Sequence, residues 1–178
     1  AVADTTWNDI GIASVFESDN DEWRDSTLVQ GVRAVEWLSE RVGLYPYPRM
    51  SVVESLMKGG GMEYPMLVMD GEASECLLFH ELAHNWFYGA LANDERSEAW
   101  LDEGLADFYT RLYLEERYGP YGNRKDWNWY RKLTPQYTLD YGARRPVAYL
   151  AHHGYRERIA TRSEDFKHDY FTSVYEHA

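Results

Sequence analysis

The sequence predicts an α+β fold in which a helix and a small sheet precede two further helices. Residues 21 to 42 place apolar side chains at three- and four-residue steps, the period of an amphipathic helix. Residues 50 to 57 and 62 to 69 are extended apolar runs separated by three glycines. Residues from about 72 to 90 and from about 97 to 118 have the composition and length of helices. This order of elements is typical of the α+β class.

The first predicted helix has an apolar stripe and a clear end. Gly43 follows the last periodic residue, and Pro46 and Pro48 prevent the helix from continuing. The stripe consists of Leu28, Val32, Val35, Leu38 and Val42.

The second extended run is expected to be an edge strand. Pro65 lies inside it and has no N–H group to donate to a neighbouring strand. In the last predicted helix, Gly119-Pro120 forms the terminator, and short helices and loops are expected after it. The apolar positions of that helix are Leu101, Leu105, Phe108, Leu112 and Leu114.

Composition excludes several classes of protein. The 178 residues are enough for one domain with a core. The net charge of −12 argues against binding to nucleic acid or to anionic membrane surfaces, which require basic patches. A single cysteine, Cys76, excludes an internal disulfide and a cysteine-rich zinc cluster. No apolar run approaches the ~20 residues of a membrane-spanning helix, and nothing indicates a compartment.

The strongest chemical signal is His80-Glu81-Leu82-Ala83-His84, inside a predicted helix. Residues four apart lie on one face of a helix, so both imidazoles can share one cation. Glu81 is rotated by about 100° from His80 and therefore lies beside the ion rather than on it. This is the position of a general base. Two surface histidines with a solvated glutamate are the alternative interpretation of the spacing alone.

A carboxylate from the next predicted helix would complete a catalytic zinc site. Two neutral nitrogens and one carboxylate leave a fourth position open, as catalytic rather than structural zinc requires. On charge alone either Asp102 or Glu103 supplies the carboxylate. Asp107 is either an outer partner of a ligand histidine or an ordinary surface residue. Cys76 is expected to be a small buried residue behind the site.

These motifs resemble the gluzincin metallopeptidases, and most closely the M1 aminopeptidases. The histidine motif and Trp100-Leu101-Asp102-Glu103-Gly104, in which Glu103 lies eighteen residues after His84, match that family. The resemblance implies a thermolysin-like catalytic domain, in which a small mixed sheet with an edge strand at the cleft packs on the active-site helices. It also implies one Zn²⁺ ion held by His80, His84 and Glu103.

A second motif points to the aminopeptidase branch. Gly60-Gly61-Met62-Glu63-Tyr64 resembles the family's Gly-x-Met-Glu-Asn exopeptidase motif, with tyrosine in place of asparagine. The resemblance implies that Gly60, Gly61, Met62 and Glu63 bind substrate, and that Glu63 binds its free α-amine. The alternative for Glu63 is a solvent-facing strand residue. A peptide could also pair with this exposed edge by strand addition.

The last residues carry a weaker match. Tyr175-Glu176-His177-Ala178 resembles the family's Tyr-Glu-Lys-Gly segment, whose tyrosine stabilises the oxyanion. The resemblance therefore gives Tyr175 this role, although thermolysin-like relatives use a histidine, for which His168 is the competing candidate.

The function expected from these motifs is zinc-dependent hydrolysis of the N-terminal peptide bond, with Glu81 as general base. The alternatives are a gluzincin endopeptidase and a non-catalytic zinc-binding module of a larger protein. Residues 1–178 are expected to be part of an M1-type catalytic domain, accompanied by other domains of the full-length enzyme. Within the chain we expect a helix-and-sheet lobe over 1–70, zinc-binding helices over 71–119 and an irregular or helical segment over 120–178.

Overall fold

The computed structural model describes residues 1–17, 19–57, 60–121, 149, 152–154, 158, 160–166 and 174. The chain forms two compact units, Ala1–Ala92 and Asn93–Ala178. The first unit contains both histidines of the predicted metal site, and the second contains Glu103.

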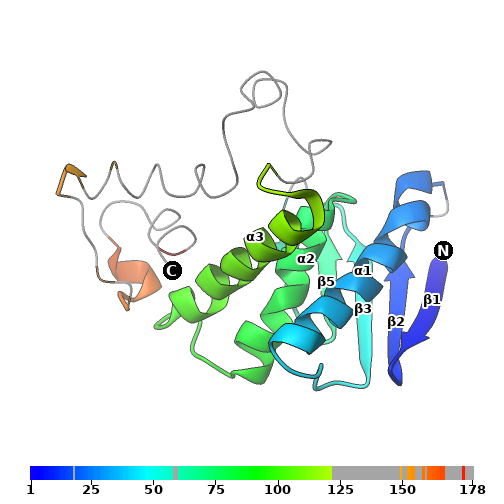
Figure 1. Cartoon of the computed structure of the whole chain (residues 1–178), viewed down its shortest axis with the longest axis horizontal. Coiled ribbons are helices and arrows are strands. Elements are labelled where there is room, and N and C mark those ends of the chain that lie inside the picture. Colours follow the sequence, from blue (N-terminus) through cyan, green and yellow to red (C-terminus); the bar gives the residue numbers. More distant parts are fainter. Residues whose placement is uncertain are drawn as a thin grey trace. The chain divides into compact units, whose positions relative to one another are not determined.

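The first unit is built on a five-stranded mixed sheet with the strand order β1-β2-β3-β5-β4 (Figure 1). β1 (Val2–Trp7) and β2 (Ile10–Val15) form an antiparallel hairpin. β3 (Arg49–Glu54) runs parallel to β2 and to β5 (Leu67–Asp70). β4 (Gly61–Met62) pairs antiparallel with β5 and forms the edge of the sheet.

The β1–β2 hairpin has no counterpart among the sequence predictions. Its turn residues, Asn8 and Asp9, both have positive φ, at 46° and 65°. Two-residue hairpin turns favour such left-handed conformations, which Asn and Asp tolerate better than most residues. The Asn8-Asp9 pair is therefore a turn signal in the sequence, which a search for strand periodicity alone does not detect.

α1 (Asp21–Arg41) confirms the first predicted helix and covers one face of the sheet. Asn20 caps it by accepting a hydrogen bond from the Trp23 N–H. The predicted stripe is only partly correct, because Val35 and Leu38 are buried while Leu28 and Val32 are half-buried. The buried face consists of Trp23, Thr27, Gly31, Ala34, Val35, Leu38 and Ser39.

The prediction of one edge strand over residues 62 to 69 is wrong. The chain turns at residues 64 to 67, so β4 and β5 are separate strands. Pro65 lies in this turn, where its missing N–H costs no strand hydrogen bond. The edge strand β4 contains Gly61 and Met62 of the exopeptidase-like motif.

α2 (Glu75–His84) continues without a break into η1 (Asn85–Ala90), a short π-helix. Together they confirm the predicted helix that ends near residue 90. Ser74 begins α2 by accepting a hydrogen bond from the Leu77 N–H, at 3.4 Å. α2 packs against α1 and against β5, and Trp37 of α1 meets Phe79 edge-on with 5.5 Å between ring centroids. The first unit thus has its core between the sheet and these two helices.

In the second unit, η2 (Trp100–Gly104) is a short π-helix that leads directly into α3 (Leu105–Tyr118). α3 ends at Gly119, as predicted, where φ is 79°. Of the apolar positions named from the sequence, Leu114 is buried, Leu101 and Leu105 are half-buried, and Phe108 and Leu112 are exposed. The other buried residues of α3 are Ala106, Thr110 and Tyr113. A short 3-10 helix, η3 (Ser163–Asp165), follows.

No helix in the described part of the chain is long and apolar enough to cross a bilayer.

Candidate metal centre

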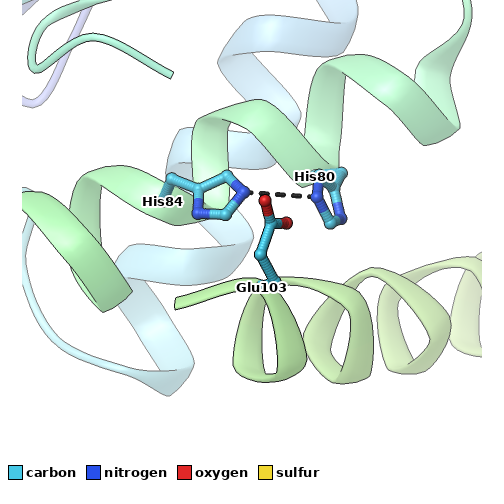
Figure 2. Close-up of side chains that lie close together, drawn as sticks. All are labelled: His80, His84 and Glu103. Atoms are coloured by element: carbon cyan, nitrogen blue, oxygen red, sulfur yellow. Dashed lines mark hydrogen bonds between the residues drawn. The ribbon is translucent and has the colours of Figure 1, made fainter. Parts of the chain in front are cut away.

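His80 and His84 lie one turn apart on α2 and point toward each other (Figure 2). Their Nε2 atoms are 3.2 Å apart. Two nitrogens that each bind one zinc ion at about 2.0–2.1 Å with tetrahedral angles are roughly 3.4 Å apart. The two imidazoles are therefore already close to the arrangement that a shared divalent ion requires. His84 is buried and His80 is half-buried.

Glu81 lies between the two histidines in sequence and is buried, with 6% of its surface exposed. Burial raises the pKa of its carboxyl group to about 7, with smaller raising effects from Asp70 and Glu63. The two histidines act in the opposite direction because a positive charge favours the carboxylate. A carboxyl group with a pKa near neutrality is suited to take up and release a proton during a reaction.

Gly61 occupies the variable position of the Gly-x-Met-Glu motif and lies on the edge strand β4, close to Glu81. A Cβ at this position would stand 2.5 Å from both Cγ and Cδ of Glu81. Real Cβ atoms do not approach other heavy atoms so closely, so a side chain at position 61 would require the flexible Glu81 carboxyl group to move. The motif and the histidine helix are therefore in direct contact within the first unit.

The other predicted substrate-binding residues follow along the same segment. Gly60 has a φ of 100°, a conformation that favours glycine. Met62 pairs with Met69 of β5 and is 37% exposed. Glu63 comes next, is half-buried, and lies near enough to Glu81 for its charge to raise the pKa of that carboxyl group.

Asp70 is a buried acid that sequence reasoning missed. It pairs with Gly61 across the β4–β5 ladder and is fully buried at the end of β5. Neither carboxyl oxygen has a hydrogen-bond partner among the residues that the structure describes. Burial, with a smaller contribution from Glu72, raises the pKa of Asp70 to about 7. The available signal was its place two residues after Val68, on the buried face of a short strand.

Cys76 corrects one sequence prediction. It is exposed rather than buried behind the histidines. Position 76 is one turn before His80, but the helix presents it to solvent at its N-terminal end.

In the second unit, Glu103 lies on η2 and is half-buried, whereas the neighbouring Asp102 is buried. Figure 2 draws Glu103, the third predicted ligand, with the two histidines. Asp107, one turn after Glu103, forms an ion pair with Arg111. Tyr175 and His168, the two candidates for oxyanion stabilisation, lie outside the described residues.

The family comparison agrees with these motifs. Residues 28–148, more than half of the chain, match the model of the peptidase family M1 domain. The chain belongs to peptidase family M1. This membership accounts for the histidine motif and for the mixed sheet packed on the helix that carries it, which is the arrangement of a gluzincin catalytic domain.

Relatives with curated names match a short stretch only. Aminopeptidase RNPEPL1 from Mus musculus and from Homo sapiens are each 45% identical over 42 residues. This stretch is 24% of the chain and 6% of each relative.

Solved structures match more of the chain. A mutant M1 zinc metallopeptidase from Deinococcus radiodurans has a TM-score of 0.64 at 18% identity, and the match covers 99% of the chain and 38% of that protein. Legionella pneumophila aminopeptidase A, in complex with aspartic acid, has a TM-score of 0.57 at 15% identity, over 68% of the chain and 17% of that protein. At such identities the likeness concerns the fold. The chain spans well under half the length of these relatives.

Proposed function

We propose that this M1 chain carries the zinc centre and amine-recognition segment of an aminopeptidase, which removes the N-terminal residue of peptides. The observation that carries the proposal is the contact between Gly61 and Glu81. This contact places the edge strand β4, which could bind a peptide, next to α2, the helix that carries the two proposed histidine ligands. Membership in peptidase family M1 supports the same function.

The proposed zinc ligands are His80, His84 and Glu103. Their side chains offer two imidazole nitrogens and a carboxylate oxygen, the kinds of donor that bind zinc. Two imidazoles and one carboxylate are the ligand set of catalytic zinc with an open fourth position. A bound zinc ion would polarise the scissile carbonyl and lower the pKa of water in the site.

Glu81 is the proposed general base. Its carboxylate takes a proton from the attacking water and passes it to the nitrogen of the leaving amine. Because Glu81 is buried beside Gly61, its carboxyl group is held against the edge strand to which a peptide could add.

Glu63 is proposed to bind the free α-amine of the substrate, with Gly60, Gly61 and Met62 lining the same segment. A carboxylate near the peptide's first residue would pair with its ammonium group. β4 is an edge strand, so a peptide could add to it by main-chain hydrogen bonds. The proposed substrate is therefore a peptide with an unblocked N-terminus.

The role of Tyr175 as the donor to the developing oxyanion stays a prediction, with His168 as the competing candidate. The division into segments 1–70, 71–119 and 120–178, within one partial catalytic domain, also stays a prediction. Other domains of a longer enzyme remain part of the proposal, because the chain covers only a small part of each named relative.

The runner-up is an endopeptidase that uses the same metal centre. The observation that favours it is Tyr64, which replaces the asparagine of the motif and is 54% exposed. A zinc-loaded full-length protein should hydrolyse peptides with a free N-terminus at least about ten-fold better than their N-acetylated counterparts, which corresponds to about 1.4 kcal/mol. Equal hydrolysis of both, or preference for the acetylated peptide, would favour the endopeptidase. A protein that binds zinc but cleaves neither would favour the non-catalytic module.

A further inference from the structure

Asn85 directly follows the predicted ligand His84 and is fully buried. Its Oδ1 atom accepts hydrogen bonds from the Met66 N–H, at 2.8 Å, and from the Tyr45 hydroxyl, at 3.3 Å. Its Nδ2 atom donates to the Leu82 carbonyl, at 3.4 Å. An N–H only donates and a carbonyl only accepts, so these partners fix the orientation of the amide. One side chain therefore connects the histidine helix to the segment after the exopeptidase-like motif.

The segment that Asn85 holds is a tight turn. The Leu67 N–H donates to the Tyr64 carbonyl at 2.9 Å, with Pro65 and Met66 between them. Met66 has a φ of 64°. Proline at the second position and positive φ at the third are the features of a type II turn, where glycine is preferred at the third position. A methionine is unfavourable in this left-handed conformation, so surrounding contacts must hold it there.

Two hydrogen bonds hold Met66 from opposite sides. The turn's own hydrogen bond joins the Leu67 N–H to the Tyr64 carbonyl and leaves the Met66 N–H unused. The Met66 N–H donates instead to the Asn85 side chain. The Met66 carbonyl accepts from the Ser51 N–H of β3, at 2.9 Å. The turn is therefore fastened to the sheet on one side and to the histidine helix on the other.

Glu63 is the residue directly before this turn. A change in the turn's conformation would displace the end of β4. The Glu63 carboxylate would then move relative to the helix that carries His80 and His84. The strand β4, which ends at the residue before Glu63, has two residues in its ladder with β5.

We propose that Asn85 is a positioning residue for substrate recognition, which locks the turn at residues 64–67 to the histidine helix. It would thereby fix the separation between the amine-binding carboxylate of Glu63 and the metal ligands. This inference rests on the proposed function, in which Glu63 binds the substrate's α-amine.

The test uses two zinc-chelating inhibitors and the zinc-loaded full-length protein. One is an α-amino-acid hydroxamate, and the other is the same compound without its amine. The unmodified protein should bind the amino compound at least about ten-fold more tightly, which corresponds to about 1.4 kcal/mol. In Asn85→Ala most of this preference should disappear. Zinc content and affinity for the compound without the amine should stay within about two-fold, or about 0.4 kcal/mol.

Tyr45→Phe is the matched control. It removes a buried hydrogen bond to the same Oδ1 atom but leaves the Met66 contact in place, so the amine preference should be retained. Asn85→Leu replaces the amide with an apolar group of similar size and gives the same test if the alanine variant does not fold. In the unmodified protein, the Met66 amide should also exchange slowly with solvent.

Several results would overturn the inference. An Asn85 variant that keeps the full amine preference shows that the turn does not depend on this amide, while the proposed amine site stands. Rapid exchange of the Met66 amide leads to the same conclusion. If the unmodified protein has no amine preference, the proposed amine site itself is wrong, and this inference fails with it.

Discussion

Gly61 lies so close to the carboxyl group of Glu81 that a methyl group at Gly61 would stand 2.5 Å from the Glu81 Cδ atom. The edge strand cannot easily withdraw, because Gly61 is paired with Asp70 of β5. The strand that we propose to bind substrate and the acid that we propose to accept the proton are thus in direct contact.

Gly61→Ala should lower kcat/KM by about 10²-fold while zinc binding is retained. The new methyl group would displace the Glu81 carboxyl group, and a misplacement of about 1 Å can cost about this factor. Gly11→Ala is the matched control on another strand, because a Cβ there meets only atoms at 3.9 Å or more. Activity of Gly61→Ala equal to that of Gly11→Ala would contradict the close contact. Steady-state kinetics and metal analysis measure both variants.

Glu63→Gln should lower kcat/KM for peptides with a free N-terminus by about 10²-fold, because a charge-assisted pair with the ammonium group is lost. Hydrolysis of the N-acetylated peptide should change by less than about two-fold, or about 0.4 kcal/mol. Glu36→Gln, at an exposed position of α1, serves as the control for loss of one negative charge. Equal losses on free and acetylated peptides would argue against amine recognition by Glu63.

His80→Ala should strongly weaken zinc binding. Loss of a residue that only hydrogen-bonds a metal ligand costs roughly 10- to 100-fold in affinity, and loss of the ligand itself should cost more. The physical reason is that one of two converging imidazole nitrogens is removed. His152→Ala changes an exposed histidine and should leave the zinc affinity unaltered. Titration with a competing chelator measures the affinity, and undiminished zinc binding by His80→Ala would remove this residue from the ligand set.

Asp70 should make the protein less stable as the pH rises from about 4 to about 7. Its pKa in the folded protein is raised to about 7, so the folded state holds a proton that the unfolded state releases in this range. Stability is therefore greatest below the pKa of the unfolded chain and falls by up to about 1.4 kcal/mol per pH unit. The loss is complete once the pH exceeds the pKa of the folded state.

Asp70→Asn removes this titration and should gain stability relative to the unmodified protein at pH 8, but not at pH 4. Urea unfolding at several pH values measures the difference. Asp25→Asn, at an exposed position of α1, should follow the unmodified protein at every pH. Parallel stability curves for Asp70→Asn and the unmodified protein would show that the buried carboxyl group does not titrate as described.

The sequence was sufficient for features that depend on local spacing. The i, i+4 interval places His80 and His84 on one helical face, and Gly43 marks the end of α1 because a terminator acts within one turn. The closeness of Gly61 to the Glu81 carboxyl group could not be predicted, because it comes from a contact between residues twenty positions apart.

Other features depend on tertiary packing and were out of reach. The division of residues 62 to 69 into two strands requires Met66 to adopt a left-handed conformation that methionine itself disfavours, and the distant Asn85 supports it. The burial of Asp70 depends on the helices that cover the sheet. The exposure of Phe108 and Leu112 on α3 also depends on packing, because apolar residues occur on more than one face of this helix.

The central claim is that Glu81 acts as the general base beside a zinc ion held by the adjacent histidines. The most direct measurement compares zinc content and turnover of Glu81→Gln with those of the unmodified full-length protein. We expect one zinc ion per chain in both proteins and a loss of turnover of at least about 10²-fold, the lower end of a general base's contribution. A zinc-loaded Glu81→Gln protein that keeps its turnover would show that Glu81 is not the general base.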